Sequence, residues 1–207
     1  MKTPDFDKVK REAIRLLSFQ EHMFELAVDV KRLIFNKTVI IDSLEQYAWI
    51  TGIDHDYETH CKLYYGLQNG CTIRAADGTY LILYDDHMKN KRRQNWSLAH
   101  EVGHIYLGHE SDGPIEEVEA NFFAAQILAP DIVIKTLVQS GVTLTEDFLY
   151  KQFFLSREAA GRKLHYLRNT LCSQSSPLEE AVLDVFSRAI RSELAWYLHK
   201  KQRVNRE

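Results

Sequence analysis

The residues best suited to chemistry are His100, Glu101 and His104, which fall within five consecutive positions. On an α-helix, residues four apart share a face, so His100 and His104 can bind one Zn²⁺. Zinc lowers the pKa of its water to about 7, and Glu101, beside the open coordination position, can take that water's proton as it attacks a polarised carbonyl. The spacing is typical of enzymes that hydrolyse amide bonds.

The sequence around this motif has the pattern of a buried helix. Two faces carry apolar residues or histidines: Trp96, His100, Gly103, His104 and Leu107 on one, and Leu98, Val102, Ile105 and His109 on the other. A helix that is apolar on two sides is usually buried, so its histidines need polar or metal partners. Glycine costs about 1 kcal/mol relative to alanine inside a helix. Gly103 therefore indicates a close approach to the backbone, and we expect a strand or the substrate there, beside the metal.

A catalytic zinc bound by two histidines requires a third protein ligand. The stretch from Ser111 to Pro114 has the composition of a loop, with proline at the first position of a new helix. Glu116, Glu117 and Glu119 follow, near the N-terminus of that helix, where acidic residues are favourable. We expect Glu117 to be solvated, and either Glu116 or Glu119 to be the ligand.

Glu119 begins a run of small and apolar residues that ends at Pro130. Glu119 shares a helix face with Phe123, which we expect to be buried, whereas Glu116 lies nearer the helix start; this favours Glu119. The run reads Glu-Ala-Asn-x-Phe-Ala-Ala-x-Ile-Leu-x-Pro. Together with the motif from His100 to His104, it resembles the ImmA/IrrE family of metallo-endopeptidases.

The resemblance extends from about Asn95 to Pro130 and implies a compact zincin-like fold. It implies zinc ligands at His100, His104 and Glu119 and a catalytic glutamate at Glu101. It also implies a protein substrate, a helix-turn-helix repressor whose cleavage switches on mobile-element or stress genes. Trp96 and Val102 stand where the family more often has phenylalanine and leucine, and neither departure affects the chemistry.

Composition limits the class of protein. The chain has 207 residues, 45% of them hydrophobic, which is enough for a real core. Its net charge of −3 gives no strong field for nucleic acid. The three cysteines, Cys61, Cys71 and Cys172, are too scattered for a disulfide framework or a cysteine zinc site. No apolar run approaches the length of a membrane span, so we expect a cytoplasmic protein without a membrane partner.

The expected fold class is α+β, with a small antiparallel sheet packed against the zinc-binding helix and further helices on the N- and C-terminal sides. Helical spacing runs from about residue 4 to 35, with a possible break near 18–21, and a short helix at 43–51 has Asp42 or Ser43 as its cap and ends at Gly52. Strand-like segments at 53–65, 70–76 and 79–84 form the expected sheet, and Asp77-Gly78 predicts a hairpin between the last two. An edge strand beside the metal can bind an extended peptide, although an ordinary structural hairpin is an equal alternative.

Beyond Pro130 the pattern is helical, with segments at 131–139, 145–154, 156–168 and 177–201. We expect a catalytic domain at 1–135 and a helical region at 136–207, which can bind a partner.

The segment 145–168 suggests a helix-turn-helix, and its second helix is basic: Arg157, Arg162, Lys163, His165 and Arg168. The alternative function is therefore a non-catalytic regulator that binds DNA or a partner, although a packing helix with a basic outer face is favoured. A general base is unnecessary at a structural zinc, which normally has four protein ligands, so the sequence favours the enzyme. A zinc hydrolase acting on something other than protein is a third, weaker alternative.

Overall fold

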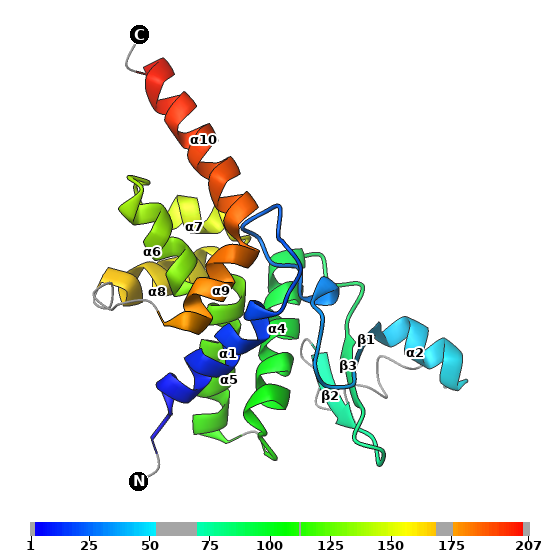
Figure 1. Ribbon diagram of the computed structural model, residues 1–207. Coiled ribbons are helices and arrows are strands. Elements are labelled where there is room, and N and C mark those ends of the chain that lie inside the picture. The colour runs from blue at the N-terminus through cyan, green and yellow to red at the C-terminus, as the bar shows by residue number, and fades with distance from the viewer. Residues whose placement is uncertain (1–2, 53–69, 112, 169–175, 205–207) are drawn as a thin grey trace. The chain divides into compact units, whose positions relative to one another are not determined.

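The structure is a computed structural model that describes residues 3–52, 70–111, 113–168 and 176–204, with side chains up to residue 200 (Figure 1). The chain forms two compact units. One consists of Met1–Pro4 and Val30–Ala124, and the other of Asp5–Asp29 and Ala125–Glu207. The motif from His100 to His104 lies in the first unit.

The sheet of the first unit has three strands in the order β1-β3-β2. Strands β2 (Gly70–Arg74) and β3 (Tyr80–Tyr84) are antiparallel and are joined through the predicted Asp77-Gly78 turn. Gly78 has a φ of 86°, a conformation that side chains other than glycine rarely adopt. The α+β class and this hairpin are confirmed. The sheet is mixed rather than antiparallel, because β1 (Val39–Ser43) pairs parallel to β3.

Strand β1 runs directly into helix α2 (Leu44–Thr51). The Ser43 side chain accepts a hydrogen bond from the backbone N–H of Gln46 at 3.0 Å, and Gly52 ends the helix in the left-handed conformation. Both predicted ends of this helix are confirmed. The strand-like segment predicted at 53–65 lies outside the described residues.

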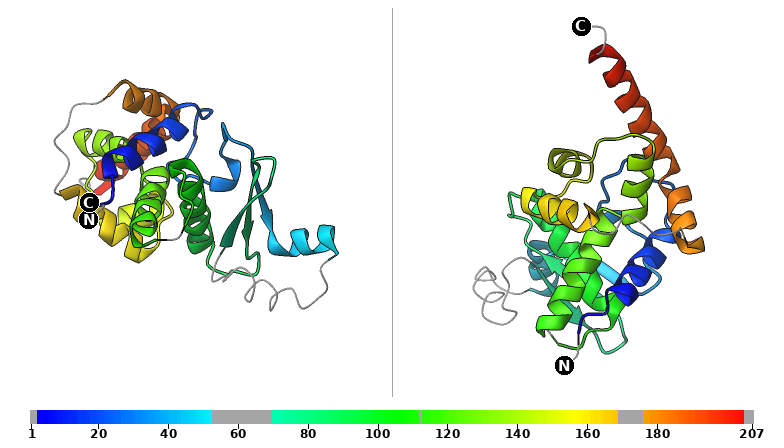
Figure 2. Two further views of the ribbon diagram at one scale, coloured as in Figure 1. Left: turned by 90° about the horizontal axis from the view of Figure 1, so that it is seen from below. Right: turned by 90° about the vertical axis from the view of Figure 1, so that its left-hand side faces the viewer.

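Two helices complete the part of the first unit that matters for the site. Helix α4 (Lys91–Leu107) begins after Asn90, whose side chain accepts from the backbone N–H of Arg93 at 3.2 Å, and ends at Gly108. Helix α5 (Pro114–Leu128) begins at the predicted proline and continues into the second unit. Figures 1 and 2 show α4 between the sheet and α5.

The described residues of the second unit form helices: α1 (Phe6–Ser18), α6 (Asp131–Gln139), α7 (Glu146–Gln152), α8 (Arg157–Arg168), α9 (Pro177–Val185) and α10 (Ser187–Val204). Helix α1 packs on α9, so the two ends of the chain contribute to one core. The helical prediction for residues 4–35 is wrong beyond Ser18, where only a short 3₁₀ turn at Val30–Arg32 follows. The predicted last helix is two helices, because the chain breaks at the buried Phe186.

Among the described residues, no single helix has both the length and the apolar character to cross a membrane. The bent pair α5–α6, with 43° between its helices, passes that test of length and composition only when taken together.

Candidate metal centre

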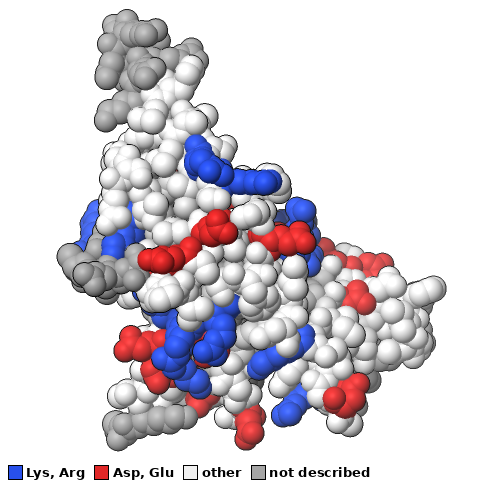
Figure 3. All heavy atoms as spheres, in the orientation of Figure 1, with Lys and Arg blue, Asp and Glu red and all other residues white. Residues whose placement is uncertain are grey.

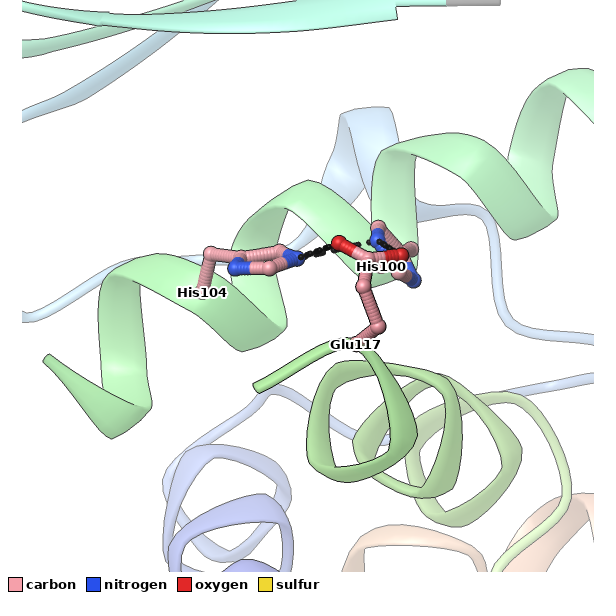
Figure 4. A group of neighbouring side chains, drawn as sticks. All are labelled: His100, His104 and Glu117. Atoms are coloured by element: carbon pink, nitrogen blue, oxygen red, sulfur yellow. Dashed lines mark hydrogen bonds and ion pairs between the residues drawn. The ribbon is translucent and has the colours of Figure 1, made fainter. Parts of the chain in front are cut away.

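Helix α4 presents His100 and His104 on one face, one turn apart, as the i, i+4 spacing requires. Their side chains are largely buried, with exposed fractions of 16% and 12%. Their Nε2 atoms lie 2.9 Å apart. Two imidazole nitrogens therefore point at the same small volume from one rigid helix (Figure 4).

Helix α5 approaches α4 unusually closely at Gly103. A Cβ atom on Gly103 would lie 3.2 Å from Ala120 Cα, from Ala120 O and from Phe123 Cβ. A second contact between the helices lies about two turns earlier on α4, where Trp96 Nε1 donates a hydrogen bond to Asn121 Oδ1 at 3.3 Å. The glycine was correctly taken as a sign of close approach, but the expectation of a strand or substrate there is wrong. The neighbour is a helix, and a small residue on each helix permits the contact.

This approach brings Glu117 to the two histidines. Its Oε1 lies 3.3 Å from His104 Nε2, and its Oε2 lies 3.5 Å from His100 Nε2. Figure 4 shows the carboxylate reaching from α5 toward the histidines on α4. The Glu117 side chain is 44% exposed, so the cluster is open to solvent on this side.

The three side chains fit a tetrahedral metal. Ligand atoms about 2.0–2.2 Å from one zinc ion lie about 3.3–3.5 Å from each other. The two carboxylate-to-imidazole distances, 3.3 Å from Oε1 to His104 and 3.5 Å from Oε2 to His100, are close to that spacing, although each involves a different oxygen; the two nitrogens, at 2.9 Å, would separate by a few tenths of an ångström. Two imidazoles and a carboxylate are a donor set that suits a catalytic zinc with one open position. The described residues hold a second, more exposed group of three such side chains, Glu45, Asp86 and His87.

Glu119, the ligand predicted from the sequence, has a different neighbour. Its Oε2 lies 3.1 Å from His109 Nε2, and His109 Nδ1 lies 3.1 Å from His104 Nδ1. Both side chains are nearly buried, at 11% and 7% exposure. The alternative candidate, Glu116, has its carboxylate against Gly113 at the helix start.

The sequence analysis expected Glu117 to be solvated rather than a ligand, and it placed His109 on a helix face without giving it a role; the structure instead brings the half-exposed Glu117 carboxylate to both histidines. A hint for Glu117 was Ala120, three residues later on the same helix face, since a small residue there can meet Gly103 on α4. A hint for His109 was its place directly after Gly108, which ends α4 with a φ of 73° and turns the chain back. Neither hint is decisive without knowing how the two helices are rotated.

Glu101 lies next to strand β2. The hydroxyl of Thr72 donates to Glu101 Oε2 at 2.6 Å, which connects the sheet to the residue following His100. Strand β2 is at one edge of the three described strands. A carboxylate, a cluster of candidate metal ligands and an edge strand of the described sheet thus occur together, and such a set can activate water against an extended peptide.

The sequence was compared with known proteins. The model of the M78 peptidases, described as the IrrE N-terminal-like domain, matches residues 55–165, more than half of the chain. Neither the curated proteins nor the solved structures contain a significant match. The matched range includes the whole of α4 and α5 and therefore every residue of the cluster. The chain belongs to the M78 peptidase family of metallopeptidases, which confirms the resemblance to the ImmA/IrrE proteins.

Proposed function

We propose that the protein is a zinc-dependent endopeptidase in which His100, His104 and Glu117 bind the metal and Glu101 is the general base. The observation that carries the proposal is the convergence of three ligand atoms from two helices, all within 4.8 Å of one another. The peptidase family supports the reaction class. The choice of Glu117 over the sequence-predicted Glu119 follows from the 3.3 and 3.5 Å approaches of its carboxylate oxygens.

The chemistry follows from these positions. A zinc ion held by His100, His104 and Glu117 would act as a Lewis acid toward the scissile carbonyl and would lower the pKa of a water molecule to about 7. Glu101 accepts a proton from the attacking water while the water oxygen bonds to the carbonyl carbon. As the C–N bond breaks, Glu101 returns that proton to the departing amine. The hydroxyl of Thr72, 2.6 Å from Glu101 Oε2, holds the carboxylate in one orientation.

Strand β2 is the proposed binding edge for the substrate. An extended segment of the substrate pairs with an edge strand through main-chain hydrogen bonds, which are largely independent of sequence. Thr72 lies in the middle of β2, opposite Ile82 of β3, so a segment paired there lies beside Glu101. This placement favours an extended segment of a protein as the substrate.

The family resemblance suggests the identity of that protein, a helix-turn-helix transcriptional repressor whose cleavage switches on mobile-element or stress genes. The test is to incubate the purified protein with repressors encoded near its gene, with zinc and with a chelator. A single internal cut, located by mass spectrometry and abolished by the chelator, supports the proposal. If the repressors stayed intact while an unrelated unfolded protein was cut under the same conditions, the proposed peptidase activity would stand. The repressors would then be excluded as its substrates.

The alternative is a non-catalytic regulator that binds DNA or a partner through residues 145–168, and its DNA-binding form finds little support. Lys163 is only 4% exposed and pairs with Asp131 at 2.6 Å, so its charge is used inside the protein. Arg157 and Arg162 pair with Asp147 and Glu158. Figure 3 shows acidic and basic side chains interspersed on the face drawn. A DNA-reading helix needs basic side chains directed outward without acidic partners.

A further inference from the structure

Behind the candidate metal centre, two side chains continue from His104 into the protein. Gly108 ends α4, and the N–H groups of Gly108 and His109 both donate to His104 O, at 3.1 and 3.0 Å. This turn places the His109 ring against the His104 ring, with 5.0 Å between the ring centroids. His109 Nδ1 is 3.1 Å from His104 Nδ1, and His109 Nε2 is 3.1 Å from Glu119 Oε2.

The chemistry of imidazole fixes where each proton must be. If His104 binds a metal through Nε2, that nitrogen carries a lone pair and the proton of the neutral ring is on Nδ1. His104 Nδ1–H then donates to His109 Nδ1, which must accept. The proton of His109 is therefore on Nε2, and it donates to the Glu119 carboxylate. The contacts from His104 to His109 and from His109 to Glu119 then each have one donor and one acceptor, and each neutral ring carries its one N–H proton in one of them.

We propose that His109 and Glu119 are positioning residues that fix the tautomer and ring plane of His104, so that its Nε2 lone pair points at the metal. The proposal rests on the proposed function, because it takes His104 to be a ligand. In this proposal Glu119 is not a metal ligand but the acceptor that orients His109. Outer partners of metal-binding histidines usually contribute about 10–100-fold to metal affinity.

The geometry separates this role from direct ligation. Both ring nitrogens of His109 are used, one toward His104 and one toward Glu119. His104 contacts His109 through Nδ1, whereas it contacts Glu117 through Nε2, on the other side of the ring. The Glu119 carboxylate is thus connected to the metal centre through two rings in series.

The test measures zinc dissociation constants of the full-length protein by competition with a chromogenic chelator. His109→Leu removes the nitrogen that accepts from His104 and replaces the ring with an apolar side chain of comparable bulk. We expect the zinc affinity of this variant to fall about 10–100-fold. His109→Asn places an amide oxygen near the former Nδ1 position, so we expect its affinity to lie closer to that of the wild type. Glu119→Leu should weaken binding in the same range as His109→Leu.

Glu179→Gln is the matched control, since Glu179 is a carboxylate of similar burial, 8% against 9% for Glu119, in the other unit. Its zinc affinity should be that of the wild type. Circular dichroism of each variant establishes that it is folded; should His109→Leu not fold, Glu119→Leu tests the same series of contacts from its other end.

Two results would overturn the proposal. If the folded His109→Leu and Glu119→Leu variants bound zinc with wild-type affinity, the contacts of His109 with His104 and Glu119 would not contribute to metal binding. Loss of binding in folded His109→Leu as complete as in a His100→Ala, His104→Ala double variant would make His109 a ligand. Failure of the proposed function is distinguishable, because in that case the double variant itself would bind zinc as the wild type does.

Discussion

Glu117 and Glu119 are two positions apart on α5, which turns their side chains about 200° around the helix from one another. Glu117 lies beside both histidines of the cluster, while Glu119 lies beside His109. We expect Glu117→Ala to lose zinc on dialysis and Glu119→Ala to retain it with affinity reduced about 10–100-fold. Metal analysis by mass spectrometry of both variants makes the comparison.

Glu116→Ala is the control for this pair, because the Glu116 carboxylate lies against Gly113 and the carboxylate grouped with the two histidines is that of Glu117. It should bind zinc as the wild type does. If Glu119→Ala lost the metal while Glu117→Ala kept it, the ligand assignment drawn from the sequence would be right and the one proposed from the structure would fail.

Glu101 is expected to act in proton transfer rather than in metal binding. Glutamine has the shape of glutamate but cannot accept the proton of water, so Glu101→Gln should keep its zinc and its fold. Loss of a general base should lower kcat by about 10²–10⁴-fold on a verified substrate. Equal rates for the variant and the wild type would remove Glu101 from the mechanism.

At the scale of elements, the contact between strand β2 and helix α4 depends on Thr72. Thr72→Val keeps the shape and the strand propensity of the residue but removes the hydroxyl that donates to Glu101. A hydrogen bond to a charged group contributes about 1.5–3 kcal/mol, so we expect kcat to fall about 10–100-fold with zinc affinity unchanged. Thr72→Ser, which keeps the hydroxyl, should recover most of the rate in a steady-state assay.

The contact between α4 and α5 depends on Gly103. Gly103→Ala gains about 1 kcal/mol of helix propensity but places a methyl group 3.2 Å from Ala120 backbone atoms. Because the two helices carry different ligands, pushing them apart should lower zinc affinity about tenfold or more. Gly161→Ala in α8 is the control, since its added Cβ meets Glu146 Oε2 at an ordinary 3.6 Å. That variant should raise the unfolding midpoint and leave zinc affinity unchanged, as measured by calorimetry and chelator competition.

The elements show what the sequence could and could not predict. Helix ends marked by local chemistry were found correctly, as at Ser43, Gly52 and Pro114, because caps and proline act within a few residues. Strand β1 was missed, since its five residues precede a helix cap and its parallel pairing with β3 is long-range. The neighbour of Gly103 and the rotation of α5 depend on how helices pack, which the spacing of residues does not determine.

At the scale of the whole molecule, the two compact units are not consecutive in the sequence. Helix α1 packs on α9 within the second unit, although 158 residues, 19–176, lie between the two helices in the sequence. Periodicity identifies each helix but says nothing about such a pairing. The division into a catalytic domain at 1–135 and a helical region at 136–207 stays a prediction.

The second unit contains a buried ion pair, and we expect it to contribute to the free energy of unfolding without affecting zinc affinity. Lys163 is 4% exposed, lies 2.6 Å from Asp131 Oδ1 and donates to Ala125 O at 3.3 Å. Burial lowers the pKa of the Lys163 ammonium group from its ordinary value, although Asp131 acts in the opposite sense. Removing one partner of a buried pair leaves an uncompensated charge, so Lys163→Ala should lower the free energy of unfolding by about 3–5 kcal/mol.

Lys151→Ala provides the comparison for this effect, because Lys151 also pairs with an aspartate, Asp147, at 2.8 Å but is 62% exposed. Exposed pairs contribute about 0–1 kcal/mol, so its unfolding curve in urea should nearly coincide with that of the wild type. Both variants should bind zinc normally while folded, since neither lysine contacts the cluster of His100, His104 and Glu117. A loss of zinc affinity in folded Lys163→Ala would instead show that the helical unit sets the geometry of the metal centre, and that α5, which belongs to both units, transmits the change.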